Sequence, residues 1–138
     1  MRIIVCLDNK SGMLFNERRQ SRDRMVIEDM LASYPGEKIY MNSFSKSLFL
    51  KYPEQIEVEE DFLKHLSEDE VGFVENLLLK PYEKNIKSLI IYKWNRDYPA
   101  DRYLDIPLDE WELTSTVEFA GYSHEQITKE TYSRKTNY

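Results

Sequence analysis

Residues 88–94 read SLIIYKW, the strongest strand pattern in the chain, and they decide the fold class. β-Branched and aromatic side chains dominate this run, and the polar residues 95–105 behind it predict a long loop. A second apolar run, RIIVCL at residues 2–7, ends in a polar turn and predicts a buried central strand. Residues 38–41 (KIYM) predict a third strand, and residues 44–49 a brief helical turn after it.

A helix is predicted between the strand at residues 2–7 and the strand at residues 38–41. It begins near Ser21 and stops at Pro35-Gly36. The apolar residues at helical spacing are Met25, Val26, Met30 and Leu31. Ser21 or Asp23 can cap the helix, because short polar side chains accept hydrogen bonds from the free N–H groups of a first turn.

The acidic middle of the chain predicts a second helix over residues 68–80. Val71, Val74 and Leu78 form an apolar stripe, and Pro81 ends the pattern. Ser67 and Glu70 match a capping box, which is typical of a helix start. The pattern leaves open whether these residues are one helix or a strand followed by a helix.

Two C-terminal segments predict an antiparallel pair of strands. Residues 111–117 alternate as a half-buried strand should, and residues 126–132 alternate as well. Strands that interleave with helices and then close as antiparallel strands are typical of α/β proteins. We therefore predict one domain, residues 1–138, with a three-layer mixed sheet, helices on both faces and antiparallel strands at the C-terminus.

Composition excludes several classes of protein. With 41% apolar and 32% charged residues, 4 Gly and 5 Pro, the chain is unlike disordered or collagen-like sequences. A single cysteine, Cys6, cannot form an internal disulfide, and we expect it to be a buried, unreactive thiol in a cytoplasmic protein. No stretch approaches a membrane span, and we expect neither a membrane anchor nor a signal peptide.

Charge is unevenly distributed along the chain, whose net charge is −6. Residues 1–24 carry six Lys or Arg against three Asp or Glu, whereas residues 53–76 carry nine acidic residues against one lysine. The acidic segment would repel a phosphate backbone, so we expect no extended nucleic acid partner. The cluster Arg18, Arg19, Arg22 and Arg24 can still hold one phosphate or carboxylate. Alternatively, these arginines lie on a solvated loop and bind no ligand.

Several segments, taken in order, resemble dihydrofolate reductase. IIVCLDNKSGMLFN (residues 3–16) resembles that family's first strand and mobile loop, and EKIYMNSFSKSLF (residues 37–49) its second strand and the following helix. LIIYKWNRDYPADRYLDIPLDEWELTSTVEF (residues 89–119), with DEWEL inside it, is the most similar stretch, and TKETYSRK (residues 128–135) resembles the last strand. The resemblance implies that family's α/β fold, and it implies a catalytic acid at the start of the first helix, where Asp23 stands.

The resemblance also implies a nicotinamide cofactor, but the motifs that hold it are replaced. The family's Gly-Gly pair corresponds to Phe73-Val74-Glu75-Asn76-Leu77, which has no glycine, and Glu75 would repel a phosphate. The family's cofactor-binding arginine is lost at residues 42–45, NSFS. We therefore predict no cofactor and expect a protein without redox activity.

A second resemblance concerns residues 18–24, RRQSRDR, which are similar to short bacterial proteins that carry a ribonuclease Z label. Ribonuclease Z itself needs a histidine-rich motif for two zinc ions. This chain has only His65 and His124, so we predict no metal site. We expect His124 to be a surface turn residue.

The ligand site is predicted where residues 16–23 meet the loop after residues 88–94. Its candidate residues are Asn16, Arg18, Arg19, Arg22, Asn42, Lys93, Asn95 and Arg96, with Asp23 as either a helix cap or a catalytic acid. The expected function is ligand binding or regulation, with a nucleotide or other small anion as ligand. The alternatives are a divergent NADPH-dependent reductase and an RNA-processing nuclease. A homo-oligomer is compatible with the 13% aromatic content.

Overall fold

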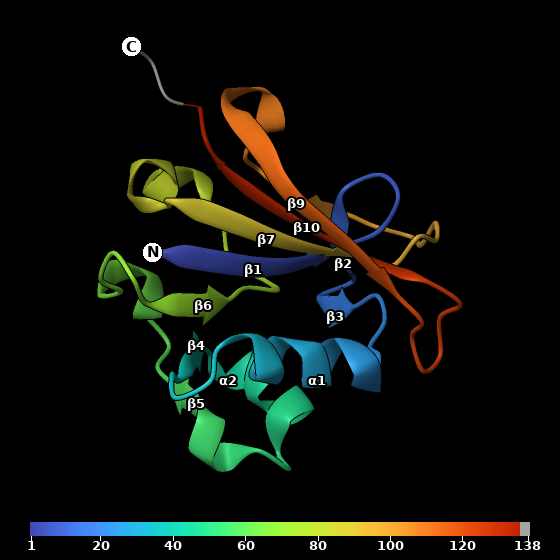
Figure 1. The fold of residues 1–138 in the computed structure, drawn as a ribbon, viewed down its shortest axis with the longest axis horizontal. Helices are drawn as coiled ribbons and strands as arrows, with labels where there is room; N and C mark the ends of the chain where they lie inside the picture. Colours follow the sequence, from blue (N-terminus) through green and yellow to red (C-terminus); the bar gives the residue numbers. More distant parts are fainter. Residues whose placement is uncertain (136–138) are drawn as a thin grey trace.

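The computed structural model describes residues 1–135 as a seven-stranded twisted sheet with a small three-stranded sheet at one end (Figure 1). The large sheet has the order β5-β4-β6-β1-β7-β10-β9, and the small sheet has the order β3-β2-β8. The strands are β1 Arg2–Leu7, β2 Gly12–Phe15, β3 Arg18–Arg19, β4 Ile39–Met41, β5 Ile56–Val58, β6 Val71–Phe73, β7 Ser88–Lys93, β8 Arg102–Tyr103, β9 Trp111–Phe119 and β10 Ile127–Arg134. The α-helices are α1 Arg24–Ser33 and α2 Ser43–Lys46.

The prediction for β1 is confirmed, because this strand lies at the centre of the large sheet. It pairs in parallel with β6 on one side and with β7 on the other. β10 is antiparallel to β7, and β9 is antiparallel to β10. The predicted mixed sheet with antiparallel C-terminal strands is therefore confirmed.

Helix α1 covers one face of the sheet and begins where the sequence predicts. Asp23 is its N-cap, with the carboxylate accepting the N–H of Met25 at 2.9 Å. Its buried side chains are Val26, Ile27, Met30 and Leu31, which pack with Ile4 of β1 and with Ile90 and Tyr92 of β7. The predicted spacing of the apolar residues therefore identified the correct face of the helix.

The opposite face of the sheet is covered by short 3₁₀ turns and loops. Three of these turns are Phe62–Lys64, Lys80–Asn85 and Leu108–Glu110. Phe62 and Leu79 are fully buried there and pack with Ile3 and Val5 of β1. The predicted three-layer arrangement is thus confirmed, with short turns in place of a long helix on this face.

The helix predicted over residues 68–80 is wrong, because Val71–Phe73 form strand β6 between β1 and β4. Half of the predicted capping box is present: the Ser67 N–H donates to the Glu70 carboxylate at 2.9 Å. Here it closes a turn that leads into a strand. All three residues of β6 are buried, and Gly72 lies against the Phe62 ring, so a place in the middle of the sheet overrides the local pattern.

Strand β9 also differs from its prediction as a half-buried strand. Trp111 is buried at its start, but the next seven residues are exposed, including Leu113 and Val117. β9 is the last strand of the sheet, so it has a neighbour on one side only. Its alternating pattern correctly predicts a strand but does not predict how many of its side chains are buried.

The small sheet was not predicted, because it is built from residues read as loops. β2 pairs with β3 and with β8, which lies inside the predicted loop 95–105. Asn16 and Glu17 connect β2 to β3, and both have left-handed backbones, with φ values of 53° and 60°. Left-handed residues suit the right-handed twist of a two-residue hairpin, but glycine usually occupies the second position.

Replacing Glu17 with glycine is expected to stabilise the protein by up to about 1 kcal/mol, because glycine avoids the cost of a left-handed backbone. Urea unfolding of the Glu17→Gly variant measures this gain. Glu17→Ala is the control that removes the same charge without relieving the backbone. An equal gain in both variants would contradict a conformational cause.

Within residues 1–135, no helix is long and apolar enough to cross a membrane.

Candidate functional site

The carboxyl ends of β1, β6 and β7 meet at one edge of the sheet, where open α/β sheets commonly bind ligands. Cys6, Glu75 and Trp94 lie at this edge. Side chains fill the space between them and leave two cavities of about 10 Å³ each. A cavity of that size holds about one water molecule. In this conformation these two cavities therefore hold only water-sized groups.

Arg19 and Glu75 close the cleft with a two-pronged ion pair. The Arg19 Nε and Nη2 atoms each lie 2.9 Å from a Glu75 carboxylate oxygen. Ser45 donates to the same carboxylate at 2.8 Å, and the Arg19 guanidinium lies 4.8 Å from the centre of the Phe44 ring. The predicted ligand residue Arg19 is therefore engaged with protein groups. The Arg19 guanidinium therefore balances the charge of Glu75, which in the sequence argued against phosphate binding.

Cys6 lies beside this ion pair. Burial raises the pKa of the Cys6 thiol well above its ordinary value, and the Glu75 carboxylate raises it further. The thiol therefore stays protonated, as expected for an unreactive cysteine, but Cys6 is half-buried and not fully buried as predicted.

Asn42 has a structural position. Its side chain caps α2 by accepting the Ser45 N–H at 3.2 Å, and it donates to Asn76 at 2.8 Å. The residue is buried. The polar groups of this candidate are therefore engaged with protein partners, as those of Arg19 are.

The predicted candidates at and after the end of β7 bond to the C-terminal strands and the loop between them. Lys93 pairs with Glu130 at 3.1 Å, and Asn95 donates to Gln126 and Thr128 across the sheet. Arg96 donates to the carbonyl of Ser123 at 2.9 Å. The structure therefore does not bring Lys93, Asn95 and Arg96 together with Arg18.

Asp23 is enclosed by hydrogen-bond donors. Besides Met25, its carboxylate accepts the N–H groups of Tyr122 and Ser123 at 2.8 Å each, and that of His124 at 3.2 Å. Desolvation by burial opposes ionisation, but these backbone bonds and the His124 side chain outweigh it and hold the pKa of Asp23 well below its usual range. The cap role predicted for Asp23 is confirmed.

The prediction that His124 is a surface turn residue is wrong. Its side chain is 1% exposed and stacks on the Trp94 ring at 4.7 Å between centroids. Nδ1 lies 2.9 Å from an Asp23 oxygen, and Nε2 lies 2.9 Å from the Tyr98 hydroxyl and 3.2 Å from the Ser21 hydroxyl. No sequence signal marks this cluster, because about a hundred residues separate His124 from Ser21 and Asp23.

A glycine allows the approach of the β9–β10 loop to Asp23. A Cβ atom at Gly121 would lie 2.7 Å from an Asp23 carboxylate oxygen and 2.7 Å from the His124 carbonyl. Any larger residue would push the loop away from the start of α1. Figure 1 shows this loop reaching the N-terminal end of the helix.

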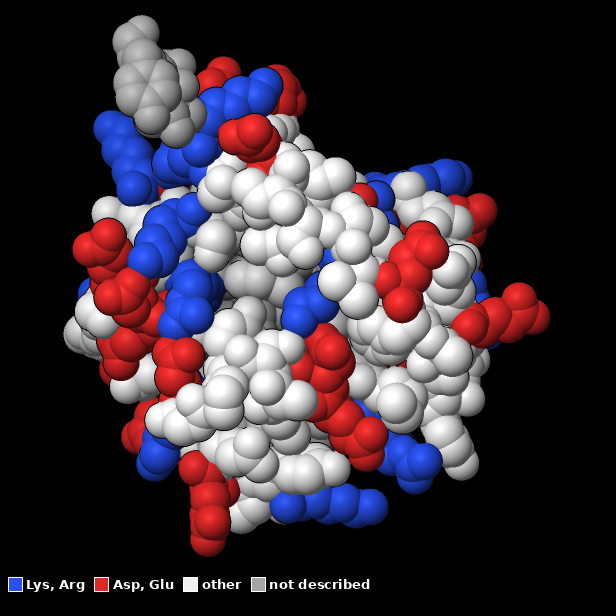
Figure 2. Space-filling view, in the orientation of Figure 1, with Lys and Arg blue, Asp and Glu red and all other residues white. Residues whose placement is uncertain are grey.

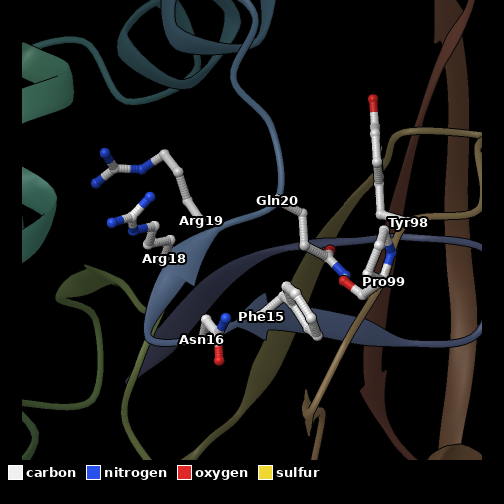
Figure 3. Close-up of a pocket in the computed structure, with 7 residues that line it drawn as sticks. All are labelled: Phe15, Asn16, Arg18, Arg19, Gln20, Tyr98 and Pro99. Atoms are coloured by element: carbon white, nitrogen blue, oxygen red, sulfur yellow. The ribbon is translucent and has the colours of Figure 1, made fainter.

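An open pocket of about 590 Å³ lies beside the small sheet, and we call it the Arg18 pocket (Figure 3). Its lining residues are Phe15, Asn16, Arg18, Arg19, Gln20, Tyr98 and Pro99. Figure 3 shows the two arginine side chains extending to the same side, with Phe15 and Tyr98 on the other. The structure thus brings the predicted segment 16–23 next to the predicted loop, through Tyr98 and Pro99.

Arg22 lines a second groove, of about 500 Å³, between the start of α1, the turn after α2 and the β9–β10 loop. Arg24 also lines it and lies 4.2 Å from the centre of the Tyr122 ring. Arg22 and Arg18 therefore face different pockets, and the four arginines do not form one cluster. The face in Figure 2 likewise carries basic and acidic side chains interspersed around a broad uncharged area.

Comparison with solved structures identifies the architecture. Dihydrofolate reductase from Enterococcus faecalis, solved in complex with NADP(H) and RAB-propyl, superposes with a TM-score of 0.70. The match covers 98% of this chain and 96% of that chain. The chain has a dihydrofolate-reductase-like fold. Sequence identity over the match is 12%, so the comparison establishes the fold alone. No family model and no curated protein matches the sequence.

The nicotinamide cofactor implied by this fold does not fit the residues present. Val74 and Glu75 stand where the family resemblance expects a glycine pair, and Val74 is buried. The Glu75 carboxylate is held by Arg19, and the cavities beside it admit about one water each. No group of metal ligands occurs within residues 1–135 either.

Proposed function

We propose that this protein binds a nucleotide or a similar anion with an aromatic ring, in the Arg18 pocket and without redox chemistry. The observation that carries the proposal is the state of Arg18. Its side chain is exposed, makes no ion pair with any residue between 1 and 135, and shares the pocket with no acidic side chain. A free guanidinium is well suited to hold a phosphate or carboxylate through two parallel hydrogen bonds.

Neighbouring residues support an aromatic ligand with a polar edge. Phe15 is 43% exposed, and its ring lines the pocket together with Tyr98. The Gln20 side-chain oxygen is buried without a hydrogen-bond partner among the described residues. A donor such as the amino group of a nucleobase would satisfy this acceptor once the Gln20 side chain turns toward the pocket.

The two alternative functions have less support. A reductase needs the cofactor that the central cleft does not fit. A nuclease needs a metal or general-base group beside a phosphate site, and Arg18 has neither among its pocket neighbours. Extended nucleic acid is also disfavoured as a partner by the net charge of −6.

Binding of nucleoside monophosphates is the first test. We expect AMP or GMP to raise the melting temperature more than ribose 5-phosphate or inorganic phosphate does, because only the nucleotides also offer a ring and an amino group. NADPH and dihydrofolate belong in the same titration as tests of the reductase alternative. Stabilisation by NADPH alone, or by none of these ligands, would contradict the proposal.

The Arg18→Ala variant identifies the pocket. It is expected to weaken nucleotide affinity about 10- to 100-fold, because a charge-assisted hydrogen bond contributes about 1.5–3 kcal/mol. Arg22→Ala is the matched control, since Arg22 is also an exposed arginine but faces the other groove. Isothermal titration calorimetry measures both. An equal loss in the two variants would point to general electrostatic attraction instead of this pocket.

A further inference from the structure

Ser21, His124 and Asp23 lie in the order of a nucleophile, a base and an orienting acid. The Ser21 hydroxyl is 3.2 Å from His124 Nε2, and His124 Nδ1 is 2.9 Å from an Asp23 carboxylate oxygen. Ser21 belongs to the coil between β3 and α1, Asp23 caps α1, and His124 comes from the β9–β10 loop. A serine, a histidine and a carboxylate that lie within hydrogen-bond distance of one another in this order can activate the serine for covalent catalysis.

The carboxylate fixes which nitrogen of His124 faces the serine as an acceptor. Asp23 accepts five backbone and ring N–H groups and stays ionised, so it attracts the hydrogen of His124 to Nδ1. The lone pair of Nε2 then faces the hydroxyl groups of Ser21 and Tyr98. Stacking on Trp94 holds the ring in this orientation.

We propose that Ser21 is a nucleophile for acyl transfer from small carboxylic esters, with His124 as the base and Asp23 as the residue that orients it. The proposal does not rest on ligand binding in the Arg18 pocket, although Tyr98 and Arg19 line that pocket too. Ser21 is partly exposed, whereas the histidine and the carboxylate behind it are buried, so a reagent from solution reaches the serine and not its partners.

The proposed reaction has two steps. The Ser21 oxygen attacks the ester carbon, its proton passes to His124 Nε2, and the bond from that carbon to the alcohol oxygen breaks as the alcohol takes the proton. Water then attacks the acyl-serine and gives a proton to His124, which returns one to the Ser21 oxygen as the acid leaves. No oxidant, reductant or metal is needed.

The space around Ser21 limits the acyl group to a small one. Both cavities of about 10 Å³ touch Ser21, and each holds about one water-sized group, comparable to the methyl group of an acetyl ester. Arg19 lines one of them and is the cation available to a tetrahedral oxyanion, whereas Glu75 lines both. The ion pair with Glu75 reduces the positive charge of Arg19, which points to modest rates.

Tyr98 competes with Ser21 for the same nitrogen. Its hydroxyl lies 2.9 Å from Nε2, closer than the serine hydroxyl, and a single lone pair accepts one strong hydrogen bond at a time. In a purely structural network the two hydroxyls would be equivalent partners of a buried histidine. In the proposed site, removing the Tyr98 hydroxyl releases Nε2 for Ser21.

A fluorophosphonate probe distinguishes these two cases. In its reaction the serine oxygen bonds to phosphorus, fluoride leaves, and the proton goes to His124. We expect one label per protein in an intact-mass spectrum, located on Ser21 by peptide mapping and absent in Ser21→Ala. The matched control is Ser115→Ala, since Ser115 is an exposed serine on β9 remote from the cluster. A wild-type protein without label, or a label retained in Ser21→Ala, would overturn the proposal.

Two more variants test the role of His124. His124→Gln is expected to slow labelling by on the order of 10³-fold, as loss of a triad base does in serine hydrolases. Tyr98→Phe keeps the aromatic ring and is expected to label several-fold faster than the wild type. Since the histidine is buried, circular dichroism checks that the His124→Gln variant is folded. If it does not fold, Tyr98→Phe decides alone, and labelling no faster than wild type would overturn the assignment.

Hydrolysis of p-nitrophenyl acetate and p-nitrophenyl butyrate tests the size of the acyl group. We expect a Ser21-dependent burst with the acetyl ester and a rate at least 10-fold lower with the butyryl ester. Equal rates with both esters would contradict the small acyl site.

Discussion

The Asp23→Asn variant is expected to unfold more easily than the wild type by about 3–5 kcal/mol at pH 7, because it breaks a fully buried charged hydrogen-bond cluster. The Asp23 side chain is 0% exposed, and its two oxygens accept hydrogen bonds from α1 and from the β9–β10 loop. An asparagine has one acceptor oxygen, so its amide group would face N–H donors that then lose their partner. Urea unfolding measures the difference, with the exposed Asp97→Asn as the control.

The same variant has a defined pH dependence. The folded-state pKa of Asp23 lies below its value in the unfolded chain, so the charged carboxylate stabilises the folded protein above the unfolded pKa. This contribution is complete near neutral pH and is lost as the pH falls below about 4, toward the folded-state pKa. The stability gap between wild type and Asp23→Asn should therefore narrow between pH 6 and pH 3. A constant gap over that range would show that packing, not charge, causes the loss.

The Trp94→Ala variant should lose a similar amount of stability, about 3–5 kcal/mol, because truncating a buried aromatic residue removes apolar contacts and leaves a cavity. Trp94 is 4% exposed, stacks on His124 and lines both small cavities at the carboxyl ends of the parallel strands. Its removal would join these cavities into one space of ligand size.

Addition of indole tests this interpretation directly. A cavity with the shape of the lost side chain should bind indole, so millimolar indole should raise the melting temperature of Trp94→Ala but not of the wild type. A loss of stability below about 1 kcal/mol, well under the usual cost of removing a buried aromatic side chain, would contradict the packing role of Trp94.

The elements predicted correctly are those whose sequence pattern matches the burial of their position in the fold. β1 and β7 are continuous apolar runs, and they lie at the centre of the sheet, where both faces are buried. Helix α1 combines a capping aspartate with apolar residues on one face. The prediction for residues 68–80 fails because the apolar run at β6 is only three residues long, too short for its period to distinguish a buried strand from a helix.

The candidate site was predicted in part. The sequence places Arg18 and Asn16 beside a loop, and the structure joins them with Tyr98 and Pro99. Arg19, Asn42 and Lys93 carry the same polar chemistry, yet they bond to Glu75, Asn76 and Glu130. Whether an arginine is free or paired depends on residues far along the chain, so no local pattern can predict it.

By itself, the sequence determined the central strands, the first helix with its Asp23 cap, and the antiparallel C-terminal pair, because hydrophobic periodicity and capping act over a few neighbouring residues. Three features depend on long-range contacts instead: β6 is a strand, Arg19 and Glu75 close the cleft, and His124 lies between Asp23 and Ser21. The physical reason is that burial and ion pairing are properties of surfaces that meet in space, and the β9–β10 loop reaches α1 only when the whole sheet has formed.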